Sequence, residues 1–275
     1  ALDTSDELNA AAAIFEEYKA HMLAIYENAR FEDLAATKSF ASAKINEESA
    51  RVIGKIENMR YIHADEEARL ITEVQNISEL ALESSELCAS ARDVESVLSV
   101  YLEELGLLDR KAERSELACA KEVSMAAADS RASELFVILD GLTYISDSLV
   151  ENIRSEISDN LSELIRSFEE AESVAVVEST LDGFIAALAE TERAAIDEEL
   201  DSAISKIGKS LGAMKIDMES HIGEMKYLSA DASAEYFALV SEICENALSQ
   251  LSAAGEVATA ESIWQSVSDA YGDLT

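Results

Sequence analysis

Apolar residues recur along this chain at spacings of three and four, which is the one-face signature of amphipathic helices. The longest such stripe runs from Lys55 to Leu105, between Gly54 and Gly106, with no proline or glycine inside it. Its apolar positions are Ile56, Met59, Leu70, Val74, Ile77, Ala81, Cys88, Val94, Leu98, Tyr101 and Leu105. A continuous helix of this length spans roughly 75 Å at about 1.5 Å per residue. The stripe predicts one long helix and, with it, a rod-shaped molecule.

Helical spacing also covers the N-terminal part of the chain. A first amphipathic helix is predicted over 5–29, with Thr4 or Ser5 as its cap. Its apolar face carries Leu8, Ile14, Phe15, Tyr18, Met22, Ile25 and Tyr26. The pattern is less regular over 30–43 and recovers from Ile45, where the long helix is predicted to begin.

Beyond the long stripe, the first reversal of the chain is predicted at 106–109. The helix that follows is predicted to end near Gly141, and the apolar spacing resumes over 150–171. A second long stripe, comparable to the first, is predicted over 200–228. Two shorter helices are predicted to close the chain, over 237–251 and 263–271.

The composition favours helix over other elements. The 275 residues contain no proline and only nine glycines, which leaves little material for turns. Each predicted helix has one apolar face and one glutamate-rich face, and such a helix is stable only when its apolar face is packed. We predict an all-α fold, an elongated antiparallel helical bundle with two long helices and shorter flanking helices, as a single domain over 1–275. We find no repeat at periods of about 34 or about 42 residues and expect no stacked array.

The charge balance excludes polyanions as partners. Fifty-six acidic residues stand against 21 basic ones, which gives a formal net charge of −35. Such a field repels nucleic acid and anionic membrane surfaces, because proteins bind both through Lys and Arg. The acidic excess has two interpretations, a solvated coat that keeps an abundant protein from self-association and an adaptation to high salt. We favour the first, because Glu far exceeds Asp and because Ser and Ala make up much of the rest.

Membrane and targeting signals are few. No stretch reaches about 18 consecutive apolar residues, so no transmembrane helix is predicted. Residue 1 is Ala, and no basic and then apolar leader follows it. This start is compatible with the mature form of a secreted precursor and equally with an arbitrary boundary.

Three patterns have a superficial likeness to functional motifs. Residues 207–210, Ile-Gly-Lys-Ser, resemble the end of a phosphate-binding loop but lack its first glycine and its preceding strand. His21, His63 and His221 are far apart and belong to no Glu-x-x-His pair of the di-metal bundles. The acidic clusters 65–67 and 197–199 lack the glycine turn and the alternating ligands of a calcium loop, so we interpret both as solvated helix faces. We expect no metal, no cofactor and no enzymatic activity.

Cys88, Cys119 and Cys244 are too far apart in sequence for a metal knuckle or a Cys-x-x-Cys redox pair. Cys88 falls on the apolar stripe, where we interpret it as a small buried hydrophobic residue. A reversal near Gly106 would also allow Cys88 to face Cys119 in a disulfide, although the two positions match poorly across an antiparallel pair. The three cysteines therefore stay open between free thiols and a disulfide.

Two Asn-x-Ser triplets, at Asn76 and Asn160, match the acceptor pattern for N-glycosylation. Both lie inside predicted helices, and such triplets arise by chance in a chain rich in serine. Glycosylation at either asparagine depends on secretion of the protein.

The chain is rich in alanine and glutamate over its whole length, as in 10–13 (Ala-Ala-Ala-Ala), 168–173 (Phe-Glu-Glu-Ala-Glu-Ser) and 186–190 (Ala-Ala-Leu-Ala-Glu). With its long proline-free helices, it resembles the glutamic acid/alanine-rich surface protein of insect-stage trypanosomes. That family is similar to the variant surface glycoproteins and the haptoglobin-haemoglobin receptor, which share an elongated helical bundle. The resemblance implies a non-enzymatic coat protein on the extracellular face of the plasma membrane, held by a glycosylphosphatidylinositol anchor.

A coat protein of this kind would act physically, as a dense acidic protective layer. The implied partners are neighbouring coat molecules and host or vector surface factors, and the membrane is reached only through the lipid anchor. The alternative is the extracellular ligand-binding (sensor) domain of a membrane receptor, which needs a polar pocket between helices. Arg60, Arg154 and Arg166 are the candidate pocket residues. A small acid bound between helices would favour the sensor, and a filled apolar interior would favour the coat.

Overall fold

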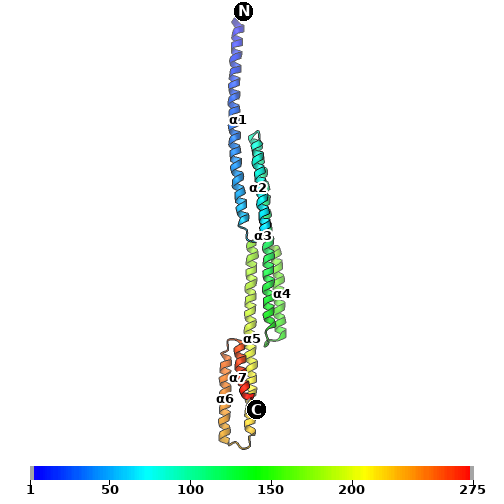
Figure 1. Ribbon diagram of the computed structural model, residues 1–275, viewed down its shortest axis with the longest axis vertical. Coiled ribbons are helices and arrows are strands. Elements are labelled where there is room, and N and C mark those ends of the chain that lie inside the picture. Colours follow the sequence, from blue (N-terminus) through cyan, green and yellow to red (C-terminus); the bar gives the residue numbers. More distant parts are fainter. Residues whose placement is uncertain (1–2, 273–275) are drawn as a thin grey trace. The chain divides into compact units, whose positions relative to one another are not determined.

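The computed structural model describes residues 3–272, and every element in that part of the chain is a helix, which confirms the predicted all-α class. The helices in Figure 1 are α1 (Asp3–Glu57), α2 (Ala64–Leu87), α3 (Ala91–Asp140), α4 (Asp147–Glu170), α5 (Val174–Glu224), α6 (Ala230–Ser252) and α7 (Val257–Gly272). Three of them are long, since α1, α3 and α5 have 55, 50 and 51 residues.

The stretch Lys55–Leu105, which was predicted to form one helix, is broken twice, so that prediction was wrong. The first break is the turn 58–63 between α1 and α2, and the second is 88–90 between α2 and α3. Ser90 caps α3, because its hydroxyl oxygen accepts a hydrogen bond from the backbone N–H of Asp93 at 3.3 Å. The apolar spacing survives both breaks because α2 and α3 turn their apolar faces to the same core.

The reversal predicted at 106–109 is absent, because α3 continues through Gly106. A single glycine costs a helix only about 1 kcal/mol. Leu105, which is 2% exposed, holds this part of α3 in the core. The possible disulfide between Cys88 and Cys119 required an antiparallel pair at this point, and it therefore loses its basis.

The helices recur at a fixed period of 83 residues. This period is longer than the periods of about 34 and about 42 residues at which the sequence shows no repeat. The short helices α2, α4 and α6 begin at Ala64, Asp147 and Ala230, which are 83 residues apart. The helices that follow them, α3, α5 and α7, begin at Ala91, Val174 and Val257, with the same spacing. The chain is thus a series of three-helix modules. The first helix of a module is the C-terminal half of a long helix, the second is a short helix, and the third is the N-terminal half of the next helix.

Contacts within the chain divide it into two compact units, Ala1–Val123 (unit 1) and Ser124–Thr275 (unit 2). Unit 1 holds one complete module, made of α1 from Leu34 onward, α2 and α3 up to Val123. Unit 2 holds two modules that share α5. The single domain expected over residues 1–275 stays a prediction.

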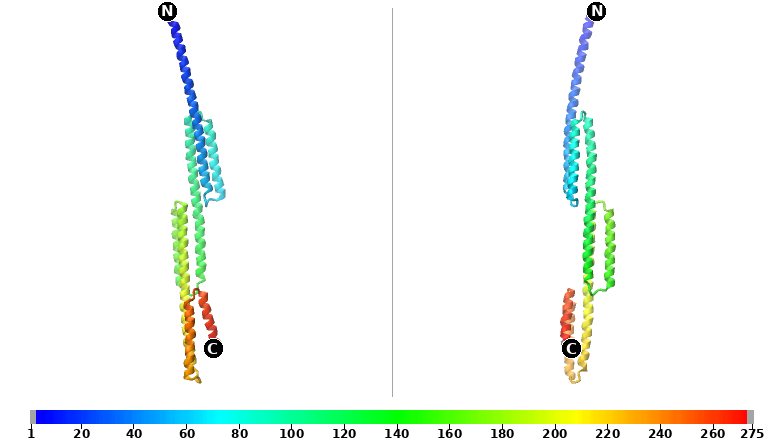
Figure 2. Two further views of the ribbon diagram at one scale, coloured as in Figure 1. Left: turned by 90° about the vertical axis from the view of Figure 1, so that its left-hand side faces the viewer. Right: turned by 45° about the vertical axis from the view of Figure 1, so that its right-hand side comes forward.

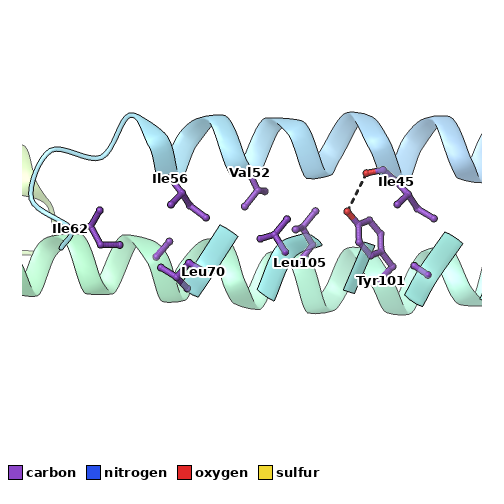
Figure 3. Close-up of a cluster of buried hydrophobic side chains, with 10 residues drawn as sticks. Ile45, Val52, Ile56, Ile62, Leu70, Tyr101 and Leu105 are labelled. Atoms are coloured by element: carbon purple, nitrogen blue, oxygen red, sulfur yellow. Dashed lines mark hydrogen bonds between the residues drawn. The ribbon is translucent and has the colours of Figure 1, made fainter. Parts of the chain in front are cut away.

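The core of unit 1 is a column of apolar side chains between α1, α2 and α3 (Figure 3). Its buried members are Ile45, Val52, Ile56, Ile62, Leu70, Val74, Ala81, Tyr101, Leu105 and Ala112. Tyr101 is the largest of them, and its hydroxyl donates a hydrogen bond to the carbonyl oxygen of Ile45 at 3.2 Å. Most of these residues lie on the stripe predicted from the sequence, so the helix faces were predicted correctly even where the helix ends were not.

α5 is the central helix of unit 2, since α4, α6 and α7 all pack against it. Figure 2 shows α6 and α7 beside the C-terminal part of α5. The core of the last module consists of Ile207, Leu211, Ala247, Leu251, Ala254 and Ala260. Positions 83 residues apart have equivalent roles, as Ile45, Ala128 and Leu211 are each buried in their own module.

Candidate functional site

The most highly connected polar group of unit 2 is the carboxylate of Glu199, which is only 4% exposed. Its Oε1 accepts hydrogen bonds from the backbone N–H groups of Thr143 at 2.6 Å and Tyr144 at 3.0 Å. Its Oε2 accepts from Tyr144 and from Ile145, both at 2.9 Å. These residues directly precede Ser146, the N-cap of α4. The carboxylate on the third helix of the module therefore closes the turn between the first and second helices.

Unit 1 contains the equivalent interaction one period earlier. Oε1 of Glu116 accepts a hydrogen bond from the backbone N–H of Arg60 at 2.9 Å. Glu116 precedes Glu199 by 83 residues, and Arg60 precedes Thr143 by the same number. We call this pairing of a third-helix carboxylate with the preceding turn the carboxylate clamp. Because it recurs at the module period, its role is architectural.

Tyr144 attaches the clamped turn of unit 2 to two further helices. Its hydroxyl donates to Oε1 of Glu261 on α7 at 2.8 Å, and Nζ of Lys206 on α5 lies 5.2 Å from its ring centroid. Burial and the hydrogen bond to Glu261 raise the pKa of Tyr144. The phenol therefore stays protonated at neutral pH and acts as a hydrogen-bond donor.

A second polar cluster lies inside the core of unit 1, where α1, α2 and α3 meet. Oγ of Ser49 lies 2.6 Å from Oγ of Ser78 and 2.7 Å from the hydroxyl oxygen of Tyr101. Oγ of Ser49 and Oγ of Ser78 also lie within hydrogen-bond distance of the carbonyl oxygens of Ile45 and Val74 on their own helices, at 2.7 and 2.6 Å. The hydroxyls thus satisfy one another and fix the register of the three helices.

The sequence predicted none of these contacts, and the interpretation of 197–199 as a solvated helix face was wrong for Glu199, which is buried. The sequence nevertheless carries a signal for these contacts. A Tyr followed by Ile or Leu recurs directly before the N-cap of each second helix, at residues 61–62, 144–145 and 227–228. This recurrence marks the turn that the clamp closes in the first two modules. Its period of 83 residues is far longer than the periods of about 34 or about 42 residues typical of helical arrays.

The N-terminal part of α1 presents an apolar face that nothing in the described structure covers. All residues of 9–33 are exposed, and α2 ends near Lys38, whose Nζ donates to the carbonyl oxygen of Glu86. In Figure 1, α1 extends past the end of α2. The side chains on this face, which we call the uncovered face of α1, are Ala11, Ile14, Phe15, Tyr18, Met22, Ile25 and Ala29. The sequence had predicted that this face would pack within the bundle, and that prediction was wrong for this part of the chain.

The two candidate glycosylation sites differ in their surroundings. Asn76 is exposed on α2, but Ser78 of its triplet is 8% exposed and belongs to the hydroxyl cluster of unit 1. Asn160 and Ser162 are both exposed on α4. Glycosylation stays a prediction at both positions, and Asn160 has the more accessible triplet.

All three cysteines are free thiols. Cys88, expected to be buried, is half-buried at the C-cap of α2, where its Sγ lies 3.3 Å from the carbonyl oxygen of Ser84. Cys119 is half-buried on α3, and Cys244 is buried on α6.

Burial raises the pKa of the Cys244 thiol, so we expect this cysteine to react with Ellman's reagent at least about tenfold more slowly than Cys88 and Cys119 at about pH 8. Rates assigned by mass spectrometry of the labelled peptides provide the measurement. Urea should remove the difference, because unfolding exposes all three thiols. Three equal rates in the folded protein would contradict the burial of Cys244.

The arginines proposed for a sensor pocket each interact with another side chain of the fold. Arg60 lies over the ring of Tyr61, with its guanidinium carbon 5.5 Å from the centroid. Arg154 pairs with Asp140, and Arg166 pairs with Glu163 of its own helix.

The described residues contain neither a cluster suited to a metal ion nor a helix suited to crossing a membrane. No three His, Cys, Asp or Glu side chains there gather in a cluster suited to a metal ion. In the same part of the chain, no helix combines the length and apolar character that crossing a membrane requires.

Comparison with known proteins gives no relative for this chain. No family model, no curated protein and no solved structure matches it. The resemblance to the trypanosome glutamic acid/alanine-rich surface protein therefore stays a prediction.

Proposed function

We propose that this chain is a non-enzymatic structural protein that contributes to an acidic protective layer at a cell surface. The observation that carries the structural role is that the buried polar groups form their hydrogen bonds within the fold. Glu199 and the cluster of Ser49, Ser78 and Tyr101 direct their hydrogen bonds to turns and helices of the fold. In the described part of the chain, every buried side-chain nitrogen or oxygen has a hydrogen-bond partner. The buried polar groups thus stabilise the packing of helices within each module.

The distribution of acidic side chains supports the protective layer. Among the described residues only Glu199 is a buried acid, so the net charge of −35 is carried almost entirely by the surface. Like-charged surfaces repel one another at close range, which keeps crowded neighbours from sticking together. The same surface disfavours nucleic acid as a partner.

The cell-surface location and its partners rest on the resemblance described above. In this proposal a lipid anchor holds the protein at the extracellular face of the plasma membrane, and its neighbours are other coat molecules and host or vector surface factors. The sensor alternative required convergent arginines around a polar pocket. Arg60, Arg154 and Arg166 interact instead with Tyr61, Asp140 and Glu163, so no observation favours that alternative.

The proposal is tested on intact cells that make the native protein. A membrane-impermeant amine reagent should label lysines of this chain before lysis, and phosphatidylinositol-specific phospholipase C should release the labelled protein. An abundant intracellular protein from the same cells serves as the control and should be labelled only after lysis. Labelling of this chain that requires lysis would exclude the surface location. Labelling without release by the phospholipase would retain the location and exclude the anchor.

A further inference from the structure

We propose that the uncovered face of α1 is the third-helix position of a further module, and that it binds an antiparallel pair of helices. This pair has the apolar pattern of the first and second helices in the modules of this chain. The proposal rests on the 83-residue period, on one acidic residue at the edge of the face, and on the length of the face.

The period relates the uncovered face to positions that are buried elsewhere in the chain. Residues one and two periods later are Val94 and Val177 for Ala11, Tyr101 and Phe184 for Tyr18, Leu105 and Leu188 for Met22, and Ala112 and Ala195 for Ala29. None of these eight later residues is more than 8% exposed, whereas Tyr18 is 71% exposed and Met22 is 63% exposed. The order of small and large side chains is the same in all three copies. The face therefore has the side-chain pattern of a third helix without its two partners.

Asp33 extends the match to the carboxylate clamp. It lies one period before Glu116 and two periods before Glu199, and its side chain is exposed. In both later copies the carboxylate accepts hydrogen bonds from backbone N–H in the turn between the first and second helices. A helix pair docked on the uncovered face would place its connecting turn beside Asp33. The site therefore has a specific polar contact in addition to its apolar contacts.

The length of the face fits a helix pair of the size found in this chain. Residues 9–33 cover about 37 Å at about 1.5 Å per residue. The short helices α2 and α4 have 24 residues each, which corresponds to nearly the same length. A pair of such helices would cover the uncovered face from end to end.

Two other occupants fit the observations less well. A second copy of this chain would offer one exposed helix, the same part of α1, where a module uses two. A lipid surface would require an excess of basic residues along the polar side of the helix. Residues 9–33 contain two basic residues, Lys19 and Arg30, against five acidic ones.

A fusion protein supplies the proposed pair in register. Residues 117–173 contain the C-terminal half of α3 and all of α4, which are the first two helices of the middle module. In the fusion, this segment is placed directly before Leu8 of this chain, in place of residues 1–7. Leu8 and Val174 are two periods apart, so the fusion reproduces the natural junction. We expect the backbone amides of 9–33 to exchange hydrogen at least about tenfold more slowly in the fusion than in the original chain. The amides of 41–123 serve as the internal reference and should exchange at the same rate in both proteins.

Three variants of the fusion show whether the protection has the proposed origin. Tyr18→Glu should abolish the protection, and it cannot disturb the rest of the original chain because Tyr18 is exposed there. Asp33→Ala should reduce the protection by roughly threefold or more, through loss of charge-assisted hydrogen bonds. Glu32→Ala, the matched control on the neighbouring acid, should leave the protection unchanged.

Unchanged exchange of 9–33 in the fusion would overturn the proposal. Protection of the original chain that rises with its own concentration would identify a second copy as the occupant and would also overturn it. Protection of the original chain by phosphatidylcholine or phosphatidylglycerol vesicles would do the same in favour of a lipid surface.

Discussion

Replacing Glu199 by glutamine is expected to lower the free energy of unfolding of unit 2 by about 3 kcal/mol. The substitution keeps the shape of the side chain but replaces one acceptor oxygen with an NH₂ group. In the place of Oε2, this group would face the backbone N–H of Ile145, which then lacks an acceptor in a buried site, and Tyr144 would keep only its hydrogen bond to Oε1. Urea unfolding followed by the fluorescence of Trp264 provides the measurement, because this is the only tryptophan of the chain and lies in unit 2.

Glu198→Gln is the matched control for this prediction. Glu198 precedes Glu199 on α5 and loses the same charge, but its side chain is exposed, so the expected change is within about 0.5 kcal/mol. Hydrogen exchange at the amides of 143–145 should accelerate in Glu199→Gln and not in Glu198→Gln. Equal effects of the two substitutions would show that the clamp contributes only through its charge.

Replacing Tyr101 by alanine is expected to destabilise unit 1 by about 3–5 kcal/mol. The side chain is 2% exposed and fills the core between three helices, so its removal leaves a cavity and leaves Ser49 without one of its partners. Tyr18 occupies the equivalent position one period earlier and is 71% exposed. Tyr18→Ala should therefore change the stability by no more than about 0.5 kcal/mol.

Hydrogen exchange of peptides within 41–123 measures both tyrosine variants in the same unit. Tyr101→Phe separates the two causes, because it removes the hydroxyl and keeps most of the volume. A loss of about 1–2 kcal/mol is expected for this variant. A large effect of Tyr18→Ala would contradict the conclusion that α1 is uncovered over 9–33.

The amphipathic spacing was sufficient to predict which face of each helix is buried. Leu70, Val74, Tyr101 and Leu105 were all placed on the apolar stripe, and all are buried in the core of unit 1. The spacing did not reveal that the stripe belongs to three helices, α1, α2 and α3. A turn of three residues, at 88–90, changes the direction of the chain without disturbing the period, because both helices face the same core.

The carboxylate clamps lay beyond what local pattern could predict. Glu116 and Glu199 are two of 56 acidic residues, and nothing in their immediate neighbours distinguishes them from a solvated glutamate. They are separated from the turns that they close by more than 50 residues. Only the long period, through the recurring Tyr-Ile and Tyr-Leu pairs, connects them to those turns.

The sequence by itself determined that this chain is helical, which side of each helix is apolar, and that the exterior is strongly acidic, because these properties depend on residues within a few turns of one another. The tertiary structure decided where the helices end and which apolar faces find a partner. Tyr18 and Tyr101 have the same local pattern, yet Tyr18 on α1 is exposed because α2 stops short of it, and Tyr101 on α3 is buried because α1 and α2 pack around it. Burial is a property of the neighbours that a side chain meets, and those neighbours come from distant parts of the chain.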